Sequence, residues 1–370
     1  MPRYVIYEAA LRRNLEVLGE VSRRTGAKIL LAQKAFSCAA VYPLCARYLA
    51  GTTASSLFEA RHGHDGFGGE THVFAPAFAA EEMDELLGLV DHIVFNSPRQ
   101  VSLYGEMARK RGVSPGLRVN PEVSVAATPA YDPCRPSSRL GTKVSGLVGF
   151  DAASVDGLHF HCLCEQGVDE LRKVLAGFEA SFGFLLPGMK WVNFGGGHHI
   201  TRPGYDVDGL VDLLDGFRAR HPGLEVYLEP GEAVALNAGV LEARVLEIQP
   251  EGEDGVANAI LDVSAACHMP DVLEMPYTPP VAGAVKGADG PFAYRFGGPT
   301  CLAGDEIGVY SFAAPLAEGA AVTFLDMAIY TMVKNNTFNG VNLPDIVLLH
   351  EDGTEAVLRR FGYGDFANRL

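Results

Sequence analysis

Hydrophobic runs alternate with amphipathic segments over roughly the first 230 residues of the chain. Residues 8–24 carry Leu11, Leu15 and Leu18 at helical spacing, and Gly26 follows where a helix commonly ends. Short apolar runs then predict eight strands, at 29–34, 51–55, 71–75, 92–96, 116–120, 157–163, 191–195 and 225–229. Helical patterns lie between several of these strands, at 81–90, 98–111, 165–182 and 208–221. Eight strands that alternate with helices over about 200 residues predict an α/β fold, the (β/α)8 or TIM-type barrel.

The pattern changes near residue 240, beyond which long helical windows are absent. Strand-like runs follow instead, punctuated by glycine and proline, such as LEARVLEIQ, ANAILDVS, VYSFAA and AVTFLD. These runs predict a C-terminal all-β domain of the sandwich or barrel-like kind. We therefore expect a barrel at 8–235 and a second domain at 236–370, to which the opening strand at 1–7 belongs. A doubly wound sheet would carry GxGxxG after its first strand, and none is present.

Composition narrows the classes of protein to which the chain could belong. The formal net charge of −15 argues against binding to nucleic acid or anionic membranes, and would favour a cationic ligand if it were focused in a cleft. No apolar run is long enough to span a bilayer, and the first residues do not resemble a signal peptide. Seven cysteines, an odd number without a secretory signal, are typical of reduced thiols. The sequence thus predicts a globular cytoplasmic protein.

Residues with catalytic potential stand at the ends of the predicted barrel strands, where barrel enzymes build their active sites. The first strand ends at Lys34, whose amine would become a nucleophile toward aldehydes if desolvation lowered its pKa. Later strands end at His161, at the glycine run 195–197 and at Glu229. Such a glycine run lets backbone amides close on a phosphate. Each feature alone also fits a structural role, so the prediction depends on their meeting at one rim.

Potential metal ligands lie close together at the sixth predicted strand, namely His159, His161, Cys162 and Cys164. If that strand continues to residue 163, alternation sends the two histidines to one face and the two cysteines to the other. Side chains on opposite faces would not converge on one ion. We therefore predict no metal site.

Several longer motifs resemble those of one enzyme family. Lys34 is followed along the chain by FHCLC, FGGGHH, EPGE, GGPTCLAGD and DMAIYT. These motifs are similar to those of the fold-type III pyridoxal phosphate-dependent decarboxylases, the group of the ornithine, arginine and diaminopimelate decarboxylases, whose barrel alanine racemase shares. Within this group, the strings YDPCRPSSRLG, NFGGGHHIT, CHMPDVLEMPY and NTFNG resemble the carboxynorspermidine (carboxyspermidine) decarboxylases. The resemblance covers nearly the whole chain.

The resemblance implies a pyridoxal 5'-phosphate cofactor and a role for each motif. Lys34 matches the lysine that binds the cofactor covalently, and His161 matches the histidine that stacks on its ring. Glu229 matches the acid at the ring nitrogen, and Tyr330 matches a tyrosine near the phosphate. The family's phosphate-binding loops are matched in this chain by four glycines, Gly195, Gly196, Gly197 and Gly231.

A homodimer with shared active sites is also implied. Cys301 matches a catalytic cysteine that the other subunit supplies in this family, and Asp305 lies in the same loop. The expected reaction is the decarboxylation of carboxynorspermidine or carboxyspermidine to norspermidine or spermidine, in polyamine biosynthesis. The carboxylates of Asp271, Glu274 and Asp305 would bind the ammonium groups of such a polyamine-type substrate.

Departures from the ornithine enzymes bear on the choice of substrate. Glu232 stands where those enzymes carry an arginine after EPG, and Thr53 and Leu302 stand where they carry aspartates. Without the second aspartate, the distal amine of ornithine would lack a counter-ion. The alternatives that remain are a diaminopimelate or other basic amino-acid decarboxylase, a racemase on the same barrel, and a cofactor-binding homologue without activity.

Overall fold

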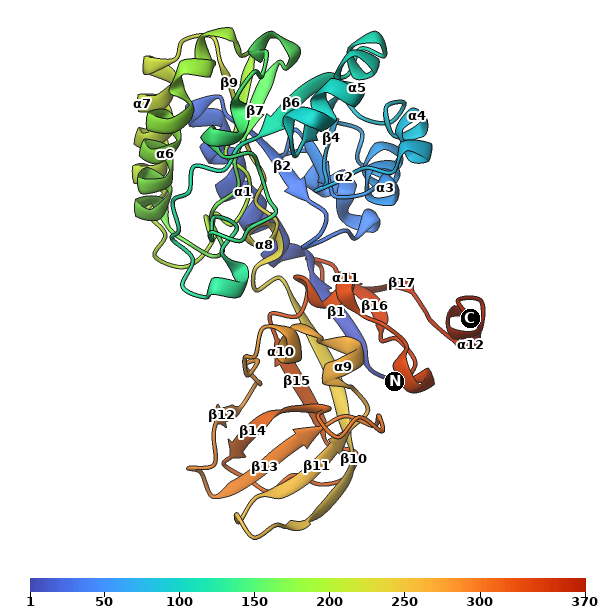
Figure 1. The fold of residues 1–370 in the computed structure, drawn as a ribbon. Helices are drawn as coiled ribbons and strands as arrows, with labels where there is room; N and C mark the ends of the chain where they lie inside the picture. The colour runs from blue at the N-terminus through green and yellow to red at the C-terminus, as the bar shows by residue number, and fades with distance from the viewer. The chain divides into compact units, whose positions relative to one another are not determined.

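The computed structural model describes residues 1–370, which form two compact units, 12–234 and 1–11 with 235–370. The first unit is a closed barrel whose strands pair in sequential order (Figure 1). All of its strand pairs are parallel. The strands are β2 (Lys28–Ala32), β3 (Gly51–Ala54), β4 (Glu70–Phe74), β5 (His92–Phe95), β6 (Ser114–Arg118), β7 (Gly157–His159), β8 (Trp191–Asn193) and β9 (Glu225–Leu228). The predicted barrel and its eight strands are confirmed.

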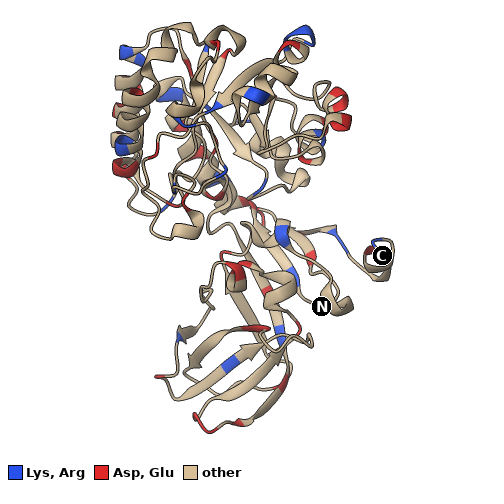
Figure 2. Cartoon of the chain, viewed as in Figure 1, with Lys and Arg blue, Asp and Glu red and all other residues tan.

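Helices follow most of the strands, and α6 and α7 lie side by side along the barrel (Figure 1). Figure 2 shows that charged residues of both signs lie on these helices. Ser56, Ser97 and Asp206 cap helices by accepting hydrogen bonds from backbone amides three residues on. The helices of this unit are α1 (Glu8–Thr25, which begins in the other unit), α2 (Tyr42–Cys45), α3 (Leu57–Phe67), α4 (Met83–Leu86), α5 (Pro98–Lys110), α6 (Val168–Phe182) and α7 (Val207–Arg220), and α8 (Glu232–Ala235) follows at the boundary.

One predicted helix is shorter than its pattern indicated. The segment 81–90 forms a 3₁₀ turn (Ala80–Glu82) followed by the single turn of α4, which stops before Gly88. Glycine loses more backbone entropy in a helix than other residues, which favours an end there. None of the helices in the structure combines the length and the apolar character that crossing a membrane would require.

Large side chains fill the barrel interior. Trp191, the only tryptophan of the chain, lies in a buried cluster with Leu30 and Tyr227. Two glycines on neighbouring strands make room for its indole, because a Cβ at Gly157 would lie 2.0 Å from the ring and one at Gly116 would lie 2.3 Å from it. The barrel is therefore a packed core, and only its ends are available for chemistry.

A polar network closes the N-terminal end of the barrel. Glu70 accepts hydrogen bonds from Lys28 Nζ at 2.6 Å and from His72 Nε2 at 3.0 Å. His72 stacks on His92, with ring centroids 4.0 Å apart and planes inclined by 18°. Although Glu70, His72 and His92 lie within ligand distance of one another, near-parallel rings do not aim their lone pairs at one point, and Lys28 already neutralises Glu70. The geometry fits a network of ion pairs and stacked rings that stabilises this end of the barrel.

The second unit is built on a nine-stranded sheet with the order β12-β14-β13-β11-β10-β1-β16-β17, in which β15 also pairs with β10. The all-β prediction is confirmed, and the four predicted runs correspond to β10, β11, β14 and β15. The strands are β1 (Arg3–Tyr7), β10 (Gly239–Glu251), β11 (Ala257–Leu261), β12 (Ala284–Lys286), β13 (Phe292–Gly297), β14 (Glu306–Phe312), β15 (Ala321–Leu325), β16 (Asp345–Leu349) and β17 (Glu355–Arg359).

The opening strand lies in the middle of this sheet. β1 is antiparallel to β10 and parallel to β16, so that Val5 lies between Val240 and Val347 in a small buried cluster. A larger apolar cluster includes Phe296 and Phe324. Short helices accompany the strands, namely α9 (Ala265–His268), α10 (Asp271–Glu274), α11 (Thr331–Lys334) and α12 (Tyr363–Ala367).

Candidate active site

Lys34 lies just beyond the first barrel strand, which ends at Ala32. The intervening residue is fixed from two sides: Gln33 N donates to Thr53 O at 3.1 Å, and the buried Gln33 side chain bonds α3 and Tyr42. The Lys34 side chain is exposed to solvent, yet many protein atoms lie near its amine. Desolvation lowers the pKa of its amine, and the charge of Arg118 acts in the same direction. The unprotonated, nucleophilic fraction of the amine is thereby larger than in an exposed lysine.

Glu229 follows β9 and is a buried carboxylate with two hydrogen-bond donors. Its Oε1 accepts from Asn193 Nδ2 at 2.8 Å, and its Oε2 accepts from His159 Nε2 at 3.2 Å. Burial alone would raise the pKa of Glu229, but these groups stabilise the anion and hold the pKa below its ordinary value. Glu229 is therefore ionised at neutral pH.

His159 contributes a hydrogen bond and not a positive charge. Burial lowers the pKa of this histidine, so its imidazole is neutral at pH 7. Its Nδ1 is buried without a hydrogen-bond partner, which fits a ring whose single proton lies on Nε2. We did not assign His159 and Asn193 to the site from the sequence. Each lies two residues before a predicted site residue, His161 or Gly195, so on the predicted strands 157–163 and 191–195 each pair would have shared one face.

His161 lies after β7, because that strand ends at His159 and not at residue 163 as predicted. The alternation argument for the two cysteines beyond it therefore does not apply. Gly196 N donates to His161 Nδ1 at 3.0 Å, which places the single proton of the neutral ring on Nε2. Burial holds the pKa of His161 well below its ordinary value, and the charges of Lys34 and Arg118 add to this effect. The ring is thus a neutral, fixed surface beside the glycine run.

Arg118, at the end of β6, is a buried cation that the sequence analysis did not single out. Its guanidinium lies 4.5 Å from the centroid of the Phe74 ring, and its Nη2 donates to His161 O at 3.1 Å. Burial lowers the pKa of Arg118 to about 10, so it remains charged at neutral pH. It thereby fixes the backbone of His161 and adds positive charge to the interior near Lys34 and Glu229.

The glycine run 195–197 packs against backbone in a way that no other residue allows. Gly195 and Gly197 have φ of +70° and +81°. A Cβ at Gly196 would lie 2.4 Å from Glu229 O, and one at Gly231 would lie 2.5 Å from Ala35 Cβ. The run therefore brings its backbone against His161 and Glu229, and Gly231 lies against Ala35, the residue after Lys34.

Two histidines after the run are buried. Both ring nitrogens of His199 lack a hydrogen-bond partner, whereas His198 has only the nearby backbone of Phe194 and Gly195, and burial lowers the pKa of each histidine to about 4. His199 Nε2 lies 3.8 Å from Glu232 Oε2, the residue that stands in place of the expected arginine. Unsatisfied buried polar atoms are costly, so this loop fits a place that receives a polar ligand.

The remaining predicted residues lie in the second unit. Cys301 is exposed, and its backbone N donates to Asn339 Oδ1 at 2.8 Å. Asp305 is buried and accepts hydrogen bonds from Ser264 Oγ at 2.9 Å and from Thr300 Oγ1 at 2.7 Å. These bonds occupy both carboxylate oxygens of Asp305 and tie the Cys301 loop to the start of α9.

Asp271 and Glu274, the predicted ammonium-binding residues, form the single turn of α10. Both carboxylates pair with Lys334 Nζ on α11. Tyr330 precedes that helix with φ of +51°, a value that is uncommon for a residue other than glycine. Such a strained residue persists only where its surroundings require it, which fits a constrained functional segment.

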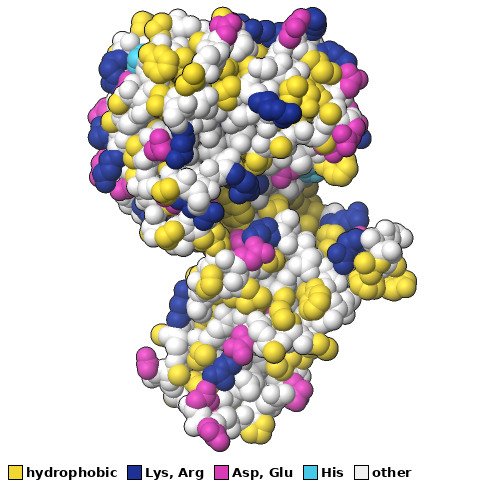
Figure 3. Space-filling model, in the orientation of Figure 1, with side chains coloured by type: hydrophobic (Ala, Val, Ile, Leu, Met, Phe, Trp, Pro, Cys, Tyr) yellow, Lys and Arg dark blue, Asp and Glu magenta, His cyan; other side chains and the backbone are white.

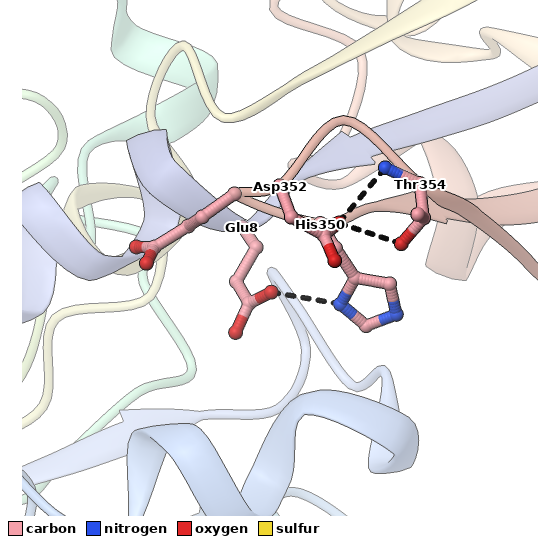
Figure 4. A pocket seen from close by; sticks show the side chains of 5 residues that line it. Glu8, His350, Asp352 and Thr354 are labelled. Atoms are coloured by element: carbon pink, nitrogen blue, oxygen red, sulfur yellow. Dashed lines mark hydrogen bonds and ion pairs between the residues drawn. The ribbon is translucent and has the colours of Figure 1, made fainter.

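An open hollow also occurs in the second unit, at the turn between β16 and β17. It is lined by Glu8, His350, Glu351, Asp352 and Thr354. Figure 4 shows Glu8 bonded to the ring of His350 and Asp352 bonded to Thr354. The Asp352 contacts are those of a tight turn, and none of the predicted site residues lies there.

Comparisons with known proteins identify the family. No protein-family model matches the chain. A carboxynorspermidine/carboxyspermidine decarboxylase of Campylobacter jejuni is 42% identical over 379 aligned residues, which cover 100% of this chain and 98% of the relative. A carboxyaminopropylagmatine decarboxylase of Synechocystis is 41% identical and aligns over 100% of this chain and 95% of its own.

Solved structures agree with these relatives. The crystal structure of carboxynorspermidine decarboxylase from Campylobacter jejuni, in complex with norspermidine, matches with a TM-score of 0.93 and 41% identity, over 100% of both chains. Diaminopimelate decarboxylase from Helicobacter pylori matches with a TM-score of 0.82 but only 16% identity, covering 100% of this chain and 96% of its own, and so shows the fold alone. The chain therefore belongs to the carboxynorspermidine/carboxyspermidine decarboxylase family, a group within the fold-type III decarboxylases.

Proposed function

We propose that this protein is a pyridoxal 5'-phosphate-dependent decarboxylase of carboxynorspermidine and carboxyspermidine, with norspermidine and spermidine as products. The observation that carries the proposal is the barrel rim, where Lys34, whose pKa is lowered, and the ionised Glu229 accompany a neutral, fixed His161. The full-length relatives supply the substrate class.

The barrel residues fit the cofactor. A phosphate needs closely packed backbone amides and polar partners, and the glycine run is followed by the buried ring of His198 and the unpartnered ring of His199. A pyridine nitrogen that is to remain protonated needs a buried anion, and Glu229 is one. When bound, the cofactor would supply an electron sink for the electron pair that remains when CO2 leaves.

Residues of this chain would prepare the rim for that chemistry. Lys34 would provide the amine that attaches the cofactor, since its lowered pKa favours the nucleophilic form. Glu229 would hold a proton on the pyridine nitrogen, and His159 and Asn193 would keep Glu229 anionic. His161 would cover one face of the ring without adding charge.

Residues of the second unit would complete the site across a homodimer. Cys301, exposed on a loop fixed by Asp305, would act in the active site of the partner subunit. Tyr330 would contact the cofactor phosphate. Asp271 and Glu274 would bind ammonium groups of the substrate, while the buried bonds of Asp305 favour a positioning role for that residue.

A substrate panel with CO2 detection tests this function. It should contain carboxynorspermidine, carboxyspermidine and carboxyaminopropylagmatine, and also diaminopimelate, ornithine and arginine as alternative substrates, each assayed separately. We expect turnover of the carboxypolyamines and loss of both turnover and cofactor absorbance in Lys34→Ala. Preference for diaminopimelate, ornithine or arginine would reject the proposed substrate class, and full turnover in Lys34→Ala would reject the role of the lysine.

A further inference from the structure

The carboxylates of α10 already hold an ammonium group that belongs to the protein. Lys334 Nζ pairs with Asp271 Oδ1 and with Glu274 Oε2. Figure 2 shows α10 in the acidic colour and α11 in the basic colour, and Figure 3 shows acidic and basic side chains in contact at this place on the surface. The amine of a lysine and the end of a polyamine are the same chemical group, so the two would compete for the same oxygens.

The two carboxylates differ in their access to solvent. The Asp271 side chain is 12% exposed, whereas the Glu274 side chain is 59% exposed. A buried carboxylate keeps its partner, because separating the pair would leave an uncompensated charge in a low-dielectric place. An exposed carboxylate exchanges partners at little cost, because water replaces the lost contact. Lys334 is therefore bound firmly to Asp271, and Glu274 is the carboxylate that a ligand can reach.

The charges of these three side chains can be summed. Asp271 and Glu274 each contribute one negative charge and Lys334 contributes one positive charge, so together they carry a net charge of −1. Burial works against the charged form of Lys334, but the bonds to Asp271 and Glu274 outweigh it and raise the pKa of the amine, so the charge is present at neutral pH.

We propose that Lys334 is a specificity-determining residue, whose ammonium occupies the Asp271 side of the pair and leaves Glu274 to bind one ammonium group of the substrate. This inference rests on the proposed function, because it takes α10 as part of the substrate site. Lys334 weakens the binding of polyamines in general by cancelling one negative charge. Lys334 also keeps Asp271 paired, and so limits this part of the site to a single substrate ammonium.

The alternative is that Lys334 only joins α10 to α11. Both roles predict that Lys334→Met is less stable, so thermal stability alone does not separate them. They differ in ligand binding. If Lys334 is purely structural, its removal leaves the affinity for norspermidine unchanged or, if the helices shift, lowers it. If its ammonium competes with the ligand, its removal raises the affinity.

The experiment is the titration of purified holoenzyme with norspermidine by calorimetry, in wild type, Lys334→Met, Lys334→Arg and Glu274→Gln. We expect about fivefold tighter binding in Lys334→Met, an affinity near that of wild type in Lys334→Arg, and about fivefold weaker binding in Glu274→Gln with little loss of thermal stability. Raised salt should reduce the differences that Lys334→Met and Glu274→Gln show from wild type.

Unchanged or weaker binding in a folded Lys334→Met overturns the inference. If that variant does not fold, Glu274→Gln decides, because an unchanged Kd there excludes the exposed carboxylate as the ligand's partner. The outcome is separable from the proposed function. A wild-type enzyme that releases CO2 from no carboxypolyamine rejects that function, whereas an active enzyme with unaltered Kd values in the variants rejects only the role of Lys334.

Discussion

His159 Nε2 lies 3.2 Å from Glu229 Oε2, and this hydrogen bond joins a neutral imidazole to a buried anion. Asn193 Nδ2 bonds the other carboxylate oxygen, so both oxygens of Glu229 have donors from neighbouring strands. The proton affinity of Glu229 is therefore set by two residues that need not touch any substrate. His159 is a positioning residue by this argument, and its effect is measurable.

The first prediction concerns His159→Leu. The variant removes the Nε2–H donor but leaves Glu229 buried, so the pKa of the carboxyl should rise. As the pH is lowered, Glu229 should then become protonated at a higher pH than in wild type. Hydrogen bonds to charged groups contribute about 1.5–3 kcal/mol, so we expect kcat to fall about 10- to 100-fold. The acid limb of the kcat profile should also move to higher pH, which a pH series of steady-state assays would measure.

Two further variants make this test specific. His159→Gln keeps an N–H donor and should recover part of both effects. His92→Leu removes a half-buried neutral histidine from the opposite end of the barrel and should leave the pH profile in place. An acid limb that does not move in His159→Leu would mean that Glu229 is held ionised by other groups.

The second prediction concerns Gly157→Ala in the barrel core. The new Cβ would lie 2.0 Å from Cδ2 of Trp191, which must then move within a packed interior. We expect a loss of about 2 kcal/mol in the free energy of unfolding, measured by urea titration. Gly157→Ala with Trp191→Phe should lose less than the sum of the two single changes, because the smaller ring relieves the overlap. Additive losses would show that the indole is not the obstacle.

Core packing of this kind explains how much of the fold the sequence could predict. The eight barrel strands are short apolar runs, and parallel strands buried on both faces need such runs. Strand ends were less accurate: the run 157–163 is apolar well past His159, where pairing stops. β1 pairs with β10 and β16, and this place depends on partners more than 200 residues away, which no local pattern encodes.

The site shows a similar division. Lys34, His161, the glycine run and Glu229 stand at strand ends, so topology alone brings them to one rim. The residues that tune them, His159, Asn193 and Arg118, were missed because they resemble ordinary interior positions. Their function appears only when hydrogen-bond partners on neighbouring strands are known.

The third prediction concerns stability at mildly acidic pH. Burial lowers the pKa of His92 to about 3 and that of His198 and His268 to about 4, whereas unfolding returns each histidine to its ordinary value near 6.5. The unfolded chain therefore binds more protons, and stability falls as the pH drops below 6.5. Each such histidine adds about 1.4 kcal/mol per pH unit to the slope.

Carboxylates do not offset this loss in the same window. Burial opposes the anion of Glu70, but His72 and Lys28 lower its pKa to about 2, so its contribution is complete above pH 4.5 and disappears only between 4.5 and 2. Urea titrations between pH 8 and pH 5 would measure the slope. His268→Asn should make it shallower, and a free energy of unfolding that is flat over this range would contradict the neutral, buried state of these histidines.

The fourth prediction concerns Asp305→Asn and decides between two roles for this carboxylate. Its oxygens hold Thr300 and Ser264, so a neutral amide would weaken the tie between the Cys301 loop and α9. If Asp305 positions the loop, kcat should fall about tenfold while KM changes little, since the loss of one charged hydrogen bond acts through Cys301. If Asp305 binds a substrate ammonium, KM should rise instead, with kcat nearly unchanged. Thr300→Val, which removes one donor and leaves the charge, should reproduce the kcat effect only under the positioning role, so steady-state kinetics of the two variants separate the alternatives.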